Sequence, residues 1–444
     1  MFEHILEQNA ITQLVSDKAG GILAPSMLFA GPHASGKGTA GLELGRVLSC
    51  ESPEAPLDCS CSGCMRHRLL THPDMLCLGS RNFSSEISAA LAGFLRAPGT
   101  IGFRTLFIRS VRKLLARFSP VLWEEEPKFS KLSDMVLSLE EALDEIWTES
   151  PSGTETLKKR CEGILKNALK LEAEGLSDLI PIGQIRRAAV WSHLVPMGKR
   201  KLLLIENADR MHEASRNSLL KILEEPPERL TILLTTSREK ALLPTILSRV
   251  RPYRFVQRSN EAEAAVIRQV FGVNPSLSGG IPGYLDSFLP MPIERLRPLA
   301  GFFAAFIAMR AALTMKKRGI SAIPEELIAL GKHAAAVAEA GNLGRPGRDT
   351  QSVITKIVTD AEKFEVRGLF SQFLNLLLSL VFESARSLYQ TGAQNPGING
   401  YYDIWRTLVN DAAVGVGIYN QNPGLALERL STELQQALNK REIQ

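Results

Sequence analysis

The sequence lacks any uninterrupted apolar run of the roughly 20 residues that a membrane-spanning helix needs. Its longest apolar stretches, Leu299–Met315 and Phe373–Phe382, are interrupted by Arg310 and by Asn375 and Ser379. The opening Met-Phe-Glu-His has neither the basic nor the apolar segment of a secretory signal peptide. We therefore expect a cytoplasmic protein that has no membrane partner.

The 444-residue chain is also poor in aromatic residues (6%) and has no excess of glycine (34) or proline (24). This composition excludes collagen-like and low-complexity proteins. Neither sign of charge dominates, because 52 Lys and Arg face 47 Asp and Glu, a formal net charge of +5. This balance permits contact with nucleic acid without indicating a protein that coats it. The length predicts roughly two to four domains.

Apolar runs that alternate with helical patterns indicate the fold of the first half. The apolar segment 24–30 leads into the glycine-rich segment Gly31–Thr39, and helix-forming residues follow. Two more apolar runs, Lys201–Ile205 and Leu230–Leu234, predict buried strands, with a helical pattern at Ala214–Glu225 between them. Strands alternating with helices predict an α/β domain with a parallel sheet and helices on both faces.

A long helical segment interrupts this pattern between about residues 79 and 178. It is too long for a loop, and apolar residues at helical spacing predict helices over 103–118, 132–146 and 154–173. The first of these is basic and the second acidic. We expect the charged faces to pair with each other or to face water, the alternative being a role in binding DNA or a partner.

Strand patterns end after Phe255, and the rest of the chain is predicted to be helical. A short segment containing Ser278–Gly283 precedes these helices, which we expect over residues 299–317, 324–340, 363–389 and 401–444. The predicted domains are residues 1–256, the short segment 257–290 and the all-α region 291–444.

Gly31, Gly36 and Lys37 have the spacing of a phosphate-binding P-loop between a strand and a helix. The glycines let backbone N–H groups turn toward an anion at a helix N-terminus, and Lys37 adds a full positive charge. The position that usually offers a Ser or Thr hydroxyl to magnesium holds Gly38, and Thr39 comes one residue late. The loop predicts a weak or degenerate site for ATP or ADP with Mg²⁺.

Disulfides are not expected in the cytoplasm, so the clustering of four of the six cysteines needs another reason. Four thiolates in a short loop can form the closed tetrahedral shell of a structural zinc ion. The predicted ligands are Cys50, Cys59, Cys61 and Cys64. His67 or His72 could replace a thiol that does not reach, and unligated core cysteines are the alternative.

The strand Lys201–Ile205 ends in Glu206 and Asn207. P-loop ATPases carry an Asp here for magnesium, often followed by a Glu that polarises the attacking water. Glu206 could still reach a metal, whereas Asn207 has no charge and cannot act as a base. Taken alone, these residues could simply end a strand.

Three ordered segments resemble the sliding-clamp loader subunits of bacterial DNA polymerase III, which are AAA+ proteins. These segments are Asn217–Glu228, Leu233–Thr236 and Leu243–Arg249, and the cysteines, His72-Pro73-Asp74 and Pro423–Leu430 fit the same pattern. The resemblance covers roughly three quarters of the chain. It implies an ATPase-like domain with a zinc module at 50–64 and a helical insertion, a small lid at 257–290 and a helical collar for oligomerisation. It also places Glu206 and Thr236 at the nucleotide.

Two branches of this family differ in chemistry, since gamma/tau subunits hydrolyse ATP and the delta-prime subunit is usually a stator. Three departures favour the delta-prime type: Gly38, the Glu206-Asn207 pair, and Tyr284 where an ATP-sensing Arg is expected. The resemblance therefore implies weak or absent ATP hydrolysis by this chain. The implied partners are gamma/tau and delta subunits, the sliding clamp and primed DNA.

Arg249 in Ser248-Arg249-Val250 matches the Ser-Arg-Cys motif of the same family, with Val250 in place of Cys. The resemblance implies that Arg249 acts as an arginine finger on the ATP of a neighbouring subunit, where a guanidinium stabilises the transferring phosphoryl group. The alternatives are a gamma/tau-type ATPase, an adenylate-kinase-like phosphotransferase suggested by Gly-Lys-Gly-Thr, and a pure scaffold.

The remaining nucleic-acid signal is weak. Five basic side chains could lie near template phosphates or form a solvated face, namely Arg186, Arg187, Lys199, Arg200 and Lys201. No residue is predicted to read bases.

Overall fold

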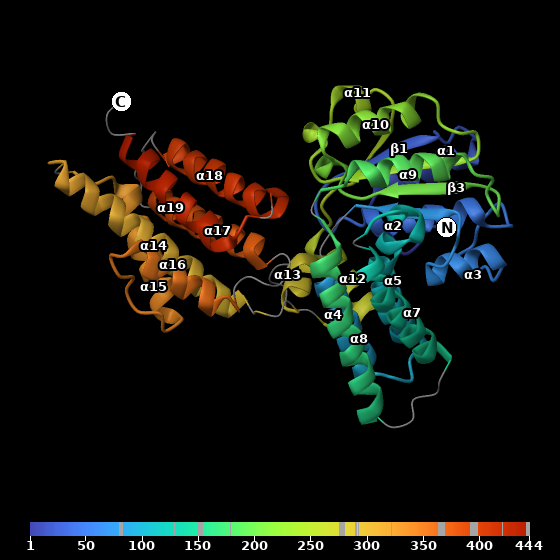
Figure 1. Ribbon diagram of the computed structural model, residues 1–444, viewed down its shortest axis with the longest axis horizontal. Helices are drawn as coiled ribbons and strands as arrows, with labels where there is room; N and C mark the ends of the chain where they lie inside the picture. Colours follow the sequence, from blue (N-terminus) through green and yellow to red (C-terminus); the bar gives the residue numbers. More distant parts are fainter. Residues whose placement is uncertain are drawn as a thin grey trace. The chain divides into compact units, whose positions relative to one another are not determined.

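The computed structural model describes residues 1–79, 83–127, 129–148, 154–177, 179–274, 280–288, 291, 293–320, 322–362, 369–390, 398–419 and 421–440. The chain divides into two compact units, Met1–Phe288 and Leu289–Gln444. Figure 1 shows a sheet covered by helices in the first unit and helices alone in the second.

The described part of the first unit contains a sheet of five strands. They are β1 (Ser26–Ala30), β2 (Met75–Leu78), β3 (Lys201–Ile205), β4 (Leu230–Thr236) and β5 (Arg251–Arg254). All neighbours pair in parallel in the order β2-β3-β4-β1-β5, which confirms the predicted α/β fold. Short β2 and β5 were not predicted, because four-residue strands at the edges of a sheet carry little periodic signal.

Thirteen α-helices belong to the described part of this unit: α1 (Asn9–Ala19), α2 (Lys37–Ser49), α3 (Ser62–Leu69), α4 (Ser84–Arg96), α5 (Ile101–Leu115), α6 (Pro120–Trp123), α7 (Ser133–Thr148), α8 (Thr154–Gly175), α9 (Ile182–His193), α10 (Glu213–Glu224), α11 (Pro244–Leu247), α12 (Asn260–Phe271) and α13 (Gly280–Asp286). Short 3₁₀ helices are η1 (Ala116–Phe118), η2 (Phe129–Lys131), η3 (Ala208–Arg210) and η4 (Glu239–Ala241).

Buried strand residues alternate between the two faces of the sheet. From β1, Leu28 and Ala30 join a core formed with α4, α5, α9 and α10, whereas Met27 and Phe29 join a core formed with α1 and α2. Every residue of β1, β3 and β4 is buried, as expected for parallel strands covered on both faces. The carboxyl ends of β1, β3 and β4 therefore meet beside the start of α2.

The segment between β2 and β3 is helical, as predicted, and contains α4 to α9, of which α4, α6 and α9 were not predicted. Phe107 of α5 and Leu143 of α7 are fully buried. The basic face of α5 pairs with the acidic face of α7, since Arg112 contacts Asp144 (Nη2–Oδ1 2.6 Å) and Glu140 (Nε–Oε2 3.3 Å). These contacts agree with the expectation that the charged faces pair with each other, the alternative having been a role in binding DNA or a partner.

The second unit is a helical bundle in the residues that the structure describes. Its helices are α14 (Ile293–Lys317), α15 (Glu325–Ala340), α16 (Thr350–Asp360), α17 (Leu369–Gln390), α18 (Ile398–Tyr419) and α19 (Pro423–Lys440). The continuous helix predicted over 401–444 was wrong, because the chain breaks before Pro423 and starts α19 there. Helix α16 was not predicted, and Lys363, the predicted start of the next helix, lies outside the described residues.

Helix α14 has the length and composition to cross a membrane, alone among the described helices. However, 72% of its apolar window is buried inside the unit, where Phe303 and Phe306 are fully covered. A core helix of a helical domain passes the same test, so this helix is weak evidence for a membrane span.

Candidate functional site

The P-loop segment, residues 31–37, connects β1 to α2, where the sequence analysis placed it. Gly36 precedes α2 with a φ of 95°, a left-handed conformation that favours glycine. A Cβ atom on Gly31 would overlap the carbonyl oxygen of Phe255, so this position also excludes a side chain. Arg258 covers the loop, since its Nη1 donates to the carbonyl of Ala34 over 2.7 Å.

The side chain of Lys37 folds back over the P-loop segment and hydrogen bonds to it. Its Nζ donates to the carbonyl oxygens of Gly31 (2.7 Å) and Pro32 and to Oγ of Ser35 (3.2 Å). Burial lowers the pKa of Lys37 to about 8, although the nearby Glu206 and Asp209 carboxylates oppose the shift. The ammonium is thus a poorly solvated cation placed at the head of a helix, which suits an anionic ligand.

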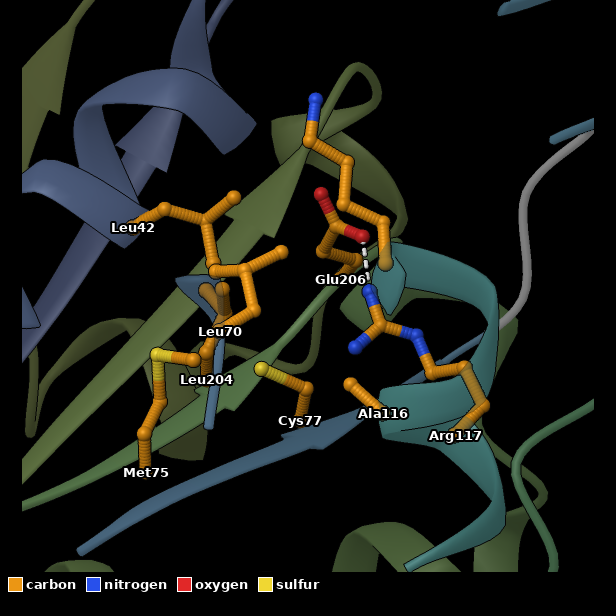
Figure 2. Close-up of a pocket in the computed structure, with 9 residues that line it drawn as sticks. Leu42, Leu70, Met75, Cys77, Ala116, Arg117, Leu204 and Glu206 are labelled. Carbon is orange, nitrogen blue, oxygen red and sulfur yellow. Dashed lines mark hydrogen bonds and ion pairs between the residues drawn. The ribbon is translucent and has the colours of Figure 1, made fainter. Parts of the chain in front are cut away.

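Glu206 at the end of β3 lies against Gly38. A Cβ atom added to Gly38 would be only 2.5 Å from Oε1 of Glu206, so the carboxylate fills the space that a side chain at residue 38 would need. The other carboxylate oxygen accepts from Nη2 of Arg117, which follows α5 in the helical segment (Figure 2). Both side chains are buried. Two residues differ from those of a usual magnesium site, namely Gly38 in place of Ser or Thr and Glu206 in place of Asp. The two differences are linked, because the larger carboxylate occupies the space beside the glycine.

A small cavity next to this ion pair is lined by apolar side chains that include Leu42, Met75 and Leu204 (Figure 2). Apolar walls strengthen the attraction between the two charges and make an unpaired charge costly. The pair is consequently a fixed feature of this edge of the sheet.

The predicted nucleotide residue Thr236 is buried at the end of β4. Its hydroxyl donates to Oδ1 of Asp209 over 2.6 Å and accepts from the backbone N–H of Arg238 over 2.9 Å. Thr39 lies exposed on the first turn of α2. The structure thus places Gly31, Gly36, Lys37, Gly38 and Glu206 together. The hydroxyl of Thr236 is bonded to Asp209, whose carboxylate lies near Lys37.

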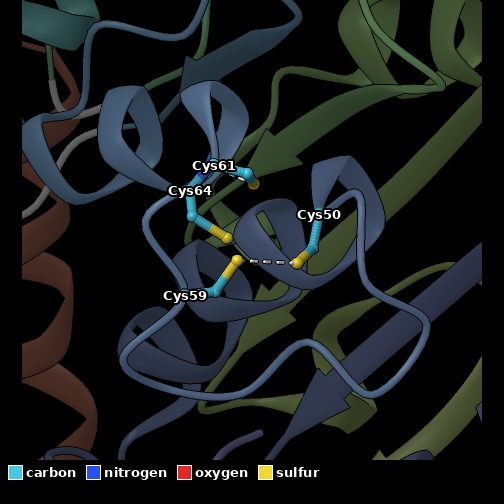
Figure 3. Close-up of side chains that lie close together, drawn as sticks. All are labelled: Cys50, Cys59, Cys61 and Cys64. Atoms are coloured by element: carbon cyan, nitrogen blue, oxygen red, sulfur yellow. Dashed lines mark hydrogen bonds between the residues drawn. The ribbon is translucent and has the colours of Figure 1, made fainter.

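The four predicted zinc ligands come together. Figure 3 shows them at the end of α2, in the following loop and at the start of α3; they are Cys50, Cys59, Cys61 and Cys64. Their sulfur atoms all lie within 4.8 Å of one another, and those of Cys50 and Cys59 are 3.6 Å apart. A tetrahedral zinc ion with Zn–S bonds of about 2.3 Å needs sulfurs about 3.8 Å apart. The donor set therefore fits a closed structural zinc site.

Arg46 supports this cluster from α2 and is itself buried. Its Nη1 donates to Sγ of Cys64 (3.1 Å) and to the carbonyl of Pro56 (3.0 Å). The Nη2 donates to the carbonyl of Ala55 (2.8 Å) and to Glu43 (2.7 Å), which also accepts from Nε (3.0 Å). The five N–H donors of this guanidinium all have partners.

The two histidines considered as substitute ligands lie elsewhere. The rings of His67 and His72 stack on each other with centroids 4.2 Å apart. His67 Nε2 hydrogen bonds with Ser49 Oγ at 2.8 Å, and burial lowers the pKa of His67 to about 3. With four thiols already in place, the cluster does not need a histidine.

Arg249 lies just after α11 at the surface, with a side chain 34% exposed. Its Nη2 contacts Oε1 of Glu224 at 2.8 Å, and Nη1 donates to the carbonyl of Thr245 at 2.8 Å. Val250 is buried in the core and anchors the segment. The guanidinium is therefore accessible and already held next to a carboxylate, an anion like a phosphate.

Tyr284, which stands where an ATP-sensing Arg was expected, packs on Phe271 and Phe288 with ring centroids 5.0 and 5.2 Å away. This residue serves an apolar cluster under α12 and α13. Where a charged side chain was expected, Tyr284 therefore contributes an aromatic ring to an apolar cluster.

The five basic residues considered for DNA phosphates are largely engaged within the chain. Lys201 is buried and its Nζ donates to the carbonyl of Trp191 over 2.6 Å. Lys199 donates to the carbonyl of Cys50 (2.6 Å), and Arg187 pairs with Glu126 (3.1 Å). Lys201 in particular cannot contact a phosphate.

Arg117, Asp209 and Arg258 are parts of the site that the sequence does not predict. Arg117 is 89 residues before Glu206, and Arg258 is 224 residues after Ala34. No local pattern encodes such pairs, because any exposed helix carries similar arginines.

Comparison with known proteins finds similarity to one family over part of the chain. Residues 147–259 match the family model described as DNA polymerase III, delta subunit. This segment contains β3, β4, β5, Glu206 and Arg249. The match therefore covers part of the proposed site and the predicted arginine finger.

Two relatives carry related names. A DNA polymerase III subunit gamma/tau of Mycobacterium tuberculosis is 40% identical over 55 residues, which are 12% of this chain and 10% of that protein. The DNA polymerase III subunit delta' of Pseudomonas aeruginosa is 38% identical over 80 residues, 18% of this chain and 24% of that protein. The chain thus spans about a quarter or less of these curated relatives.

A crystal structure of a DNA polymerase III gamma subunit-related protein from Thermotoga maritima aligns with 59% of this chain and 80% of its own, with 20% identity and a TM-score of 0.23. The fold described above rests on strand pairing and not on this alignment.

Proposed function

We propose that the chain is a delta-prime-type subunit of the clamp-loader family of DNA polymerase III, to which it is similar over part of its length. Such a subunit hydrolyses little or no ATP itself and donates Arg249 to the ATP of a neighbouring subunit. Its role is to complete that neighbour's site while the sliding clamp is opened and placed on primed DNA.

The observation that carries this proposal is the arrangement of Gly38, Glu206 and Arg117. Mg²⁺ in P-loop ATPases needs a hydroxyl from the loop and a carboxylate from the strand end. Here Gly38 has no hydroxyl, and the Glu206 carboxylate fills the space beside it while paired with Arg117. Asn207 next to it has no basic side chain. ATP hydrolysis at this chain's own site therefore lacks both the metal ligands and the base.

Arg249 supplies the second half of the proposal. Its accessible guanidinium can exchange Glu224 for the phosphate of an adjoining subunit, because both anions accept from its planar fork. An arginine supplied in trans stabilises the charge on the transferring phosphoryl group.

The rest of the chain is assigned parts that suit an assembly. We take residues 1–256 as the ATPase-like domain, with structural zinc at 50–64 and the insertion at about 79–178. Residues 257–290 form a lid, and 291–444 a collar that holds gamma/tau- and delta-type subunits. The sliding clamp and primed DNA are the further partners, and the compartment is the cytoplasm.

Two assays test this function. The isolated zinc-loaded chain should hydrolyse no ATP above background in Mg²⁺. An assembly reconstituted with gamma/tau- and delta-type subunits should lose most of its clamp- and DNA-stimulated turnover when it carries Arg249→Ala. Normal turnover of that assembly would indicate a pure scaffold.

A gamma/tau-type ATPase is the second candidate, favoured by the 40% identity over 55 residues to the mycobacterial gamma/tau subunit and by the intact Gly31, Gly36 and Lys37. Hydrolysis by the isolated chain that Lys37→Ala abolishes would support it.

A further inference from the structure

The helical insertion reaches the P-loop segment through Arg117. This residue lies in η1, directly after α5, and its backbone carbonyl accepts from Nε1 of Trp123 over 2.7 Å. Its guanidinium lies over the ring of Phe83, 5.6 Å from the centroid, and pairs with Glu206. The backbone of Arg117 is thus held by the insertion, and its guanidinium is held by the strand-end carboxylate, the contact drawn in Figure 2.

The partner of Arg117 is fixed in turn against the first turn of α2. Oε1 of Glu206 lies 2.5 Å from the place where a Cβ atom of residue 38 would be. A glutamate end is normally free to rotate away from such a contact, but here the other oxygen is held by a buried guanidinium. The ion pair therefore requires a residue without a side chain at position 38, in addition to the loss of the hydroxyl that a Ser or Thr would provide there.

We propose that Arg117 stands in the place of the divalent cation of this P-loop, so that the insertion keeps magnesium out of the chain's own site. A guanidinium brings one positive charge to the carboxylate and, since it has no lone pair to offer, cannot be a ligand to a metal. A nucleoside phosphate that enters this site does so as a metal-free anion, bound by backbone N–H groups and Lys37. This inference deepens the proposed lack of hydrolysis and rests on it.

A double-mutant cycle tests the link between residues 38 and 117 without any ligand. Gly38→Thr should lower the unfolding temperature of the zinc-loaded chain, because its Cβ meets the pinned carboxylate. In an Arg117→Met background that loss should fall by at least half, since Glu206 is then able to turn away. Arg112→Met is the matched control, because Arg112 lies on α5 and pairs with α7, and it should leave the loss unchanged.

An equal loss with and without Arg117 overturns the proposal. If Arg117→Met does not fold, Glu206→Ala takes its place in the cycle. It removes the oxygen that the new side chain at residue 38 would meet, so the loss should again fall by at least half, and an unchanged loss overturns the proposal in the same way.

Metal exclusion is measured by equilibrium dialysis of Mn²⁺ with ADP, without chelator so that zinc is retained. The chain with Gly38→Thr and Arg117→Met should retain at least three times as much Mn²⁺ as the native chain, and equal retention overturns the proposal. Magnesium-dependent ATP hydrolysis by the native chain would instead remove the proposed function itself. If the native chain hydrolyses no ATP but Gly38→Thr destabilises the chain equally with and without Arg117, only this inference is removed and the proposed function stands.

Discussion

Four thiolates around one zinc ion would carry a net charge of two minus, and Arg46 places a hydrogen-bond donor on the sulfur of Cys64. Partners of this kind typically change metal affinity by about 10- to 100-fold. We expect Arg46→Met to weaken zinc binding by that factor, because Cys64 loses the N–H donor and the loop at Ala55 and Pro56 loses its anchor. Competition with a chromophoric chelator measures the effect.

The control for this substitution is Arg66→Met, which removes an exposed arginine of α3 in the same module. It should leave zinc affinity unchanged. Arg46→Met that holds zinc as tightly as the native chain would show that the contact with Cys64 is unimportant.

The buried ammonium of Lys37 makes stability depend on pH. Its pKa is about 8 in the folded chain and about 10.5 when unfolded, so between these values the unfolded chain binds more protons and the folded state gains stability as pH rises. Relative to Lys37→Met, the native chain should gain about 1–3 kcal/mol between pH 7.5 and pH 10. Chemical unfolding of both proteins at the two pH values measures this; a constant difference would mean that Lys37 is not desolvated.

At this scale the sequence predicts the residues whose chemistry is local. The P-loop glycines, Lys37 and the four cysteines could be predicted because each group lies within one short segment. The pairing of Arg117 with Glu206 could not, since it depends on how a helical segment folds back onto the sheet. Which of many arginines approaches the strand end is decided by packing.

At the scale of elements, the insertion is held together by one apolar interior shared by α5, α7 and α8. Leu143 of α7 is fully buried there, whereas Leu137 of the same helix is 61% exposed. We expect Leu143→Ala to lower the free energy of unfolding by about 2–5 kcal/mol through the cavity it leaves. The matched Leu137→Ala should stay within about 0.5 kcal/mol, and urea unfolding compares the two. Equal effects would place α7 outside the packed core.

The predicted elements were right where a pattern was long. The strands β1, β3 and β4 are continuous apolar runs, and the helices α5, α7 and α8 repeat apolar residues at helical spacing. Short β2 and β5, α4 and α16 were missed, and the break between α18 and α19 was passed over. Packing against neighbouring segments decides the missed elements, and Pro423, which follows the polar residues Gln421 and Asn422, starts α19.

At the scale of the whole molecule, the two proposed tasks belong to separate places on the first unit. At the carboxyl ends of the strands, the P-loop segment lies beside the buried ion pair of Glu206 and Arg117. The segment after α11 carries Arg249 at the surface, next to Glu224. A subunit built this way can complete a neighbour's site while its own site stays inactive.

Single-turnover ATP hydrolysis by the neighbouring gamma/tau-type subunit, in an assembly reconstituted with the native chain or with Arg249→Ala, tests this division most directly. The account predicts that the neighbour's hydrolysis slows by about 10³-fold or more with Arg249→Ala, while assembly is retained. Arg254→Ala, which removes a nearby arginine with a side chain 69% exposed, should have no such effect. Hydrolysis by the neighbour at the native rate in the Arg249→Ala assembly would contradict the account.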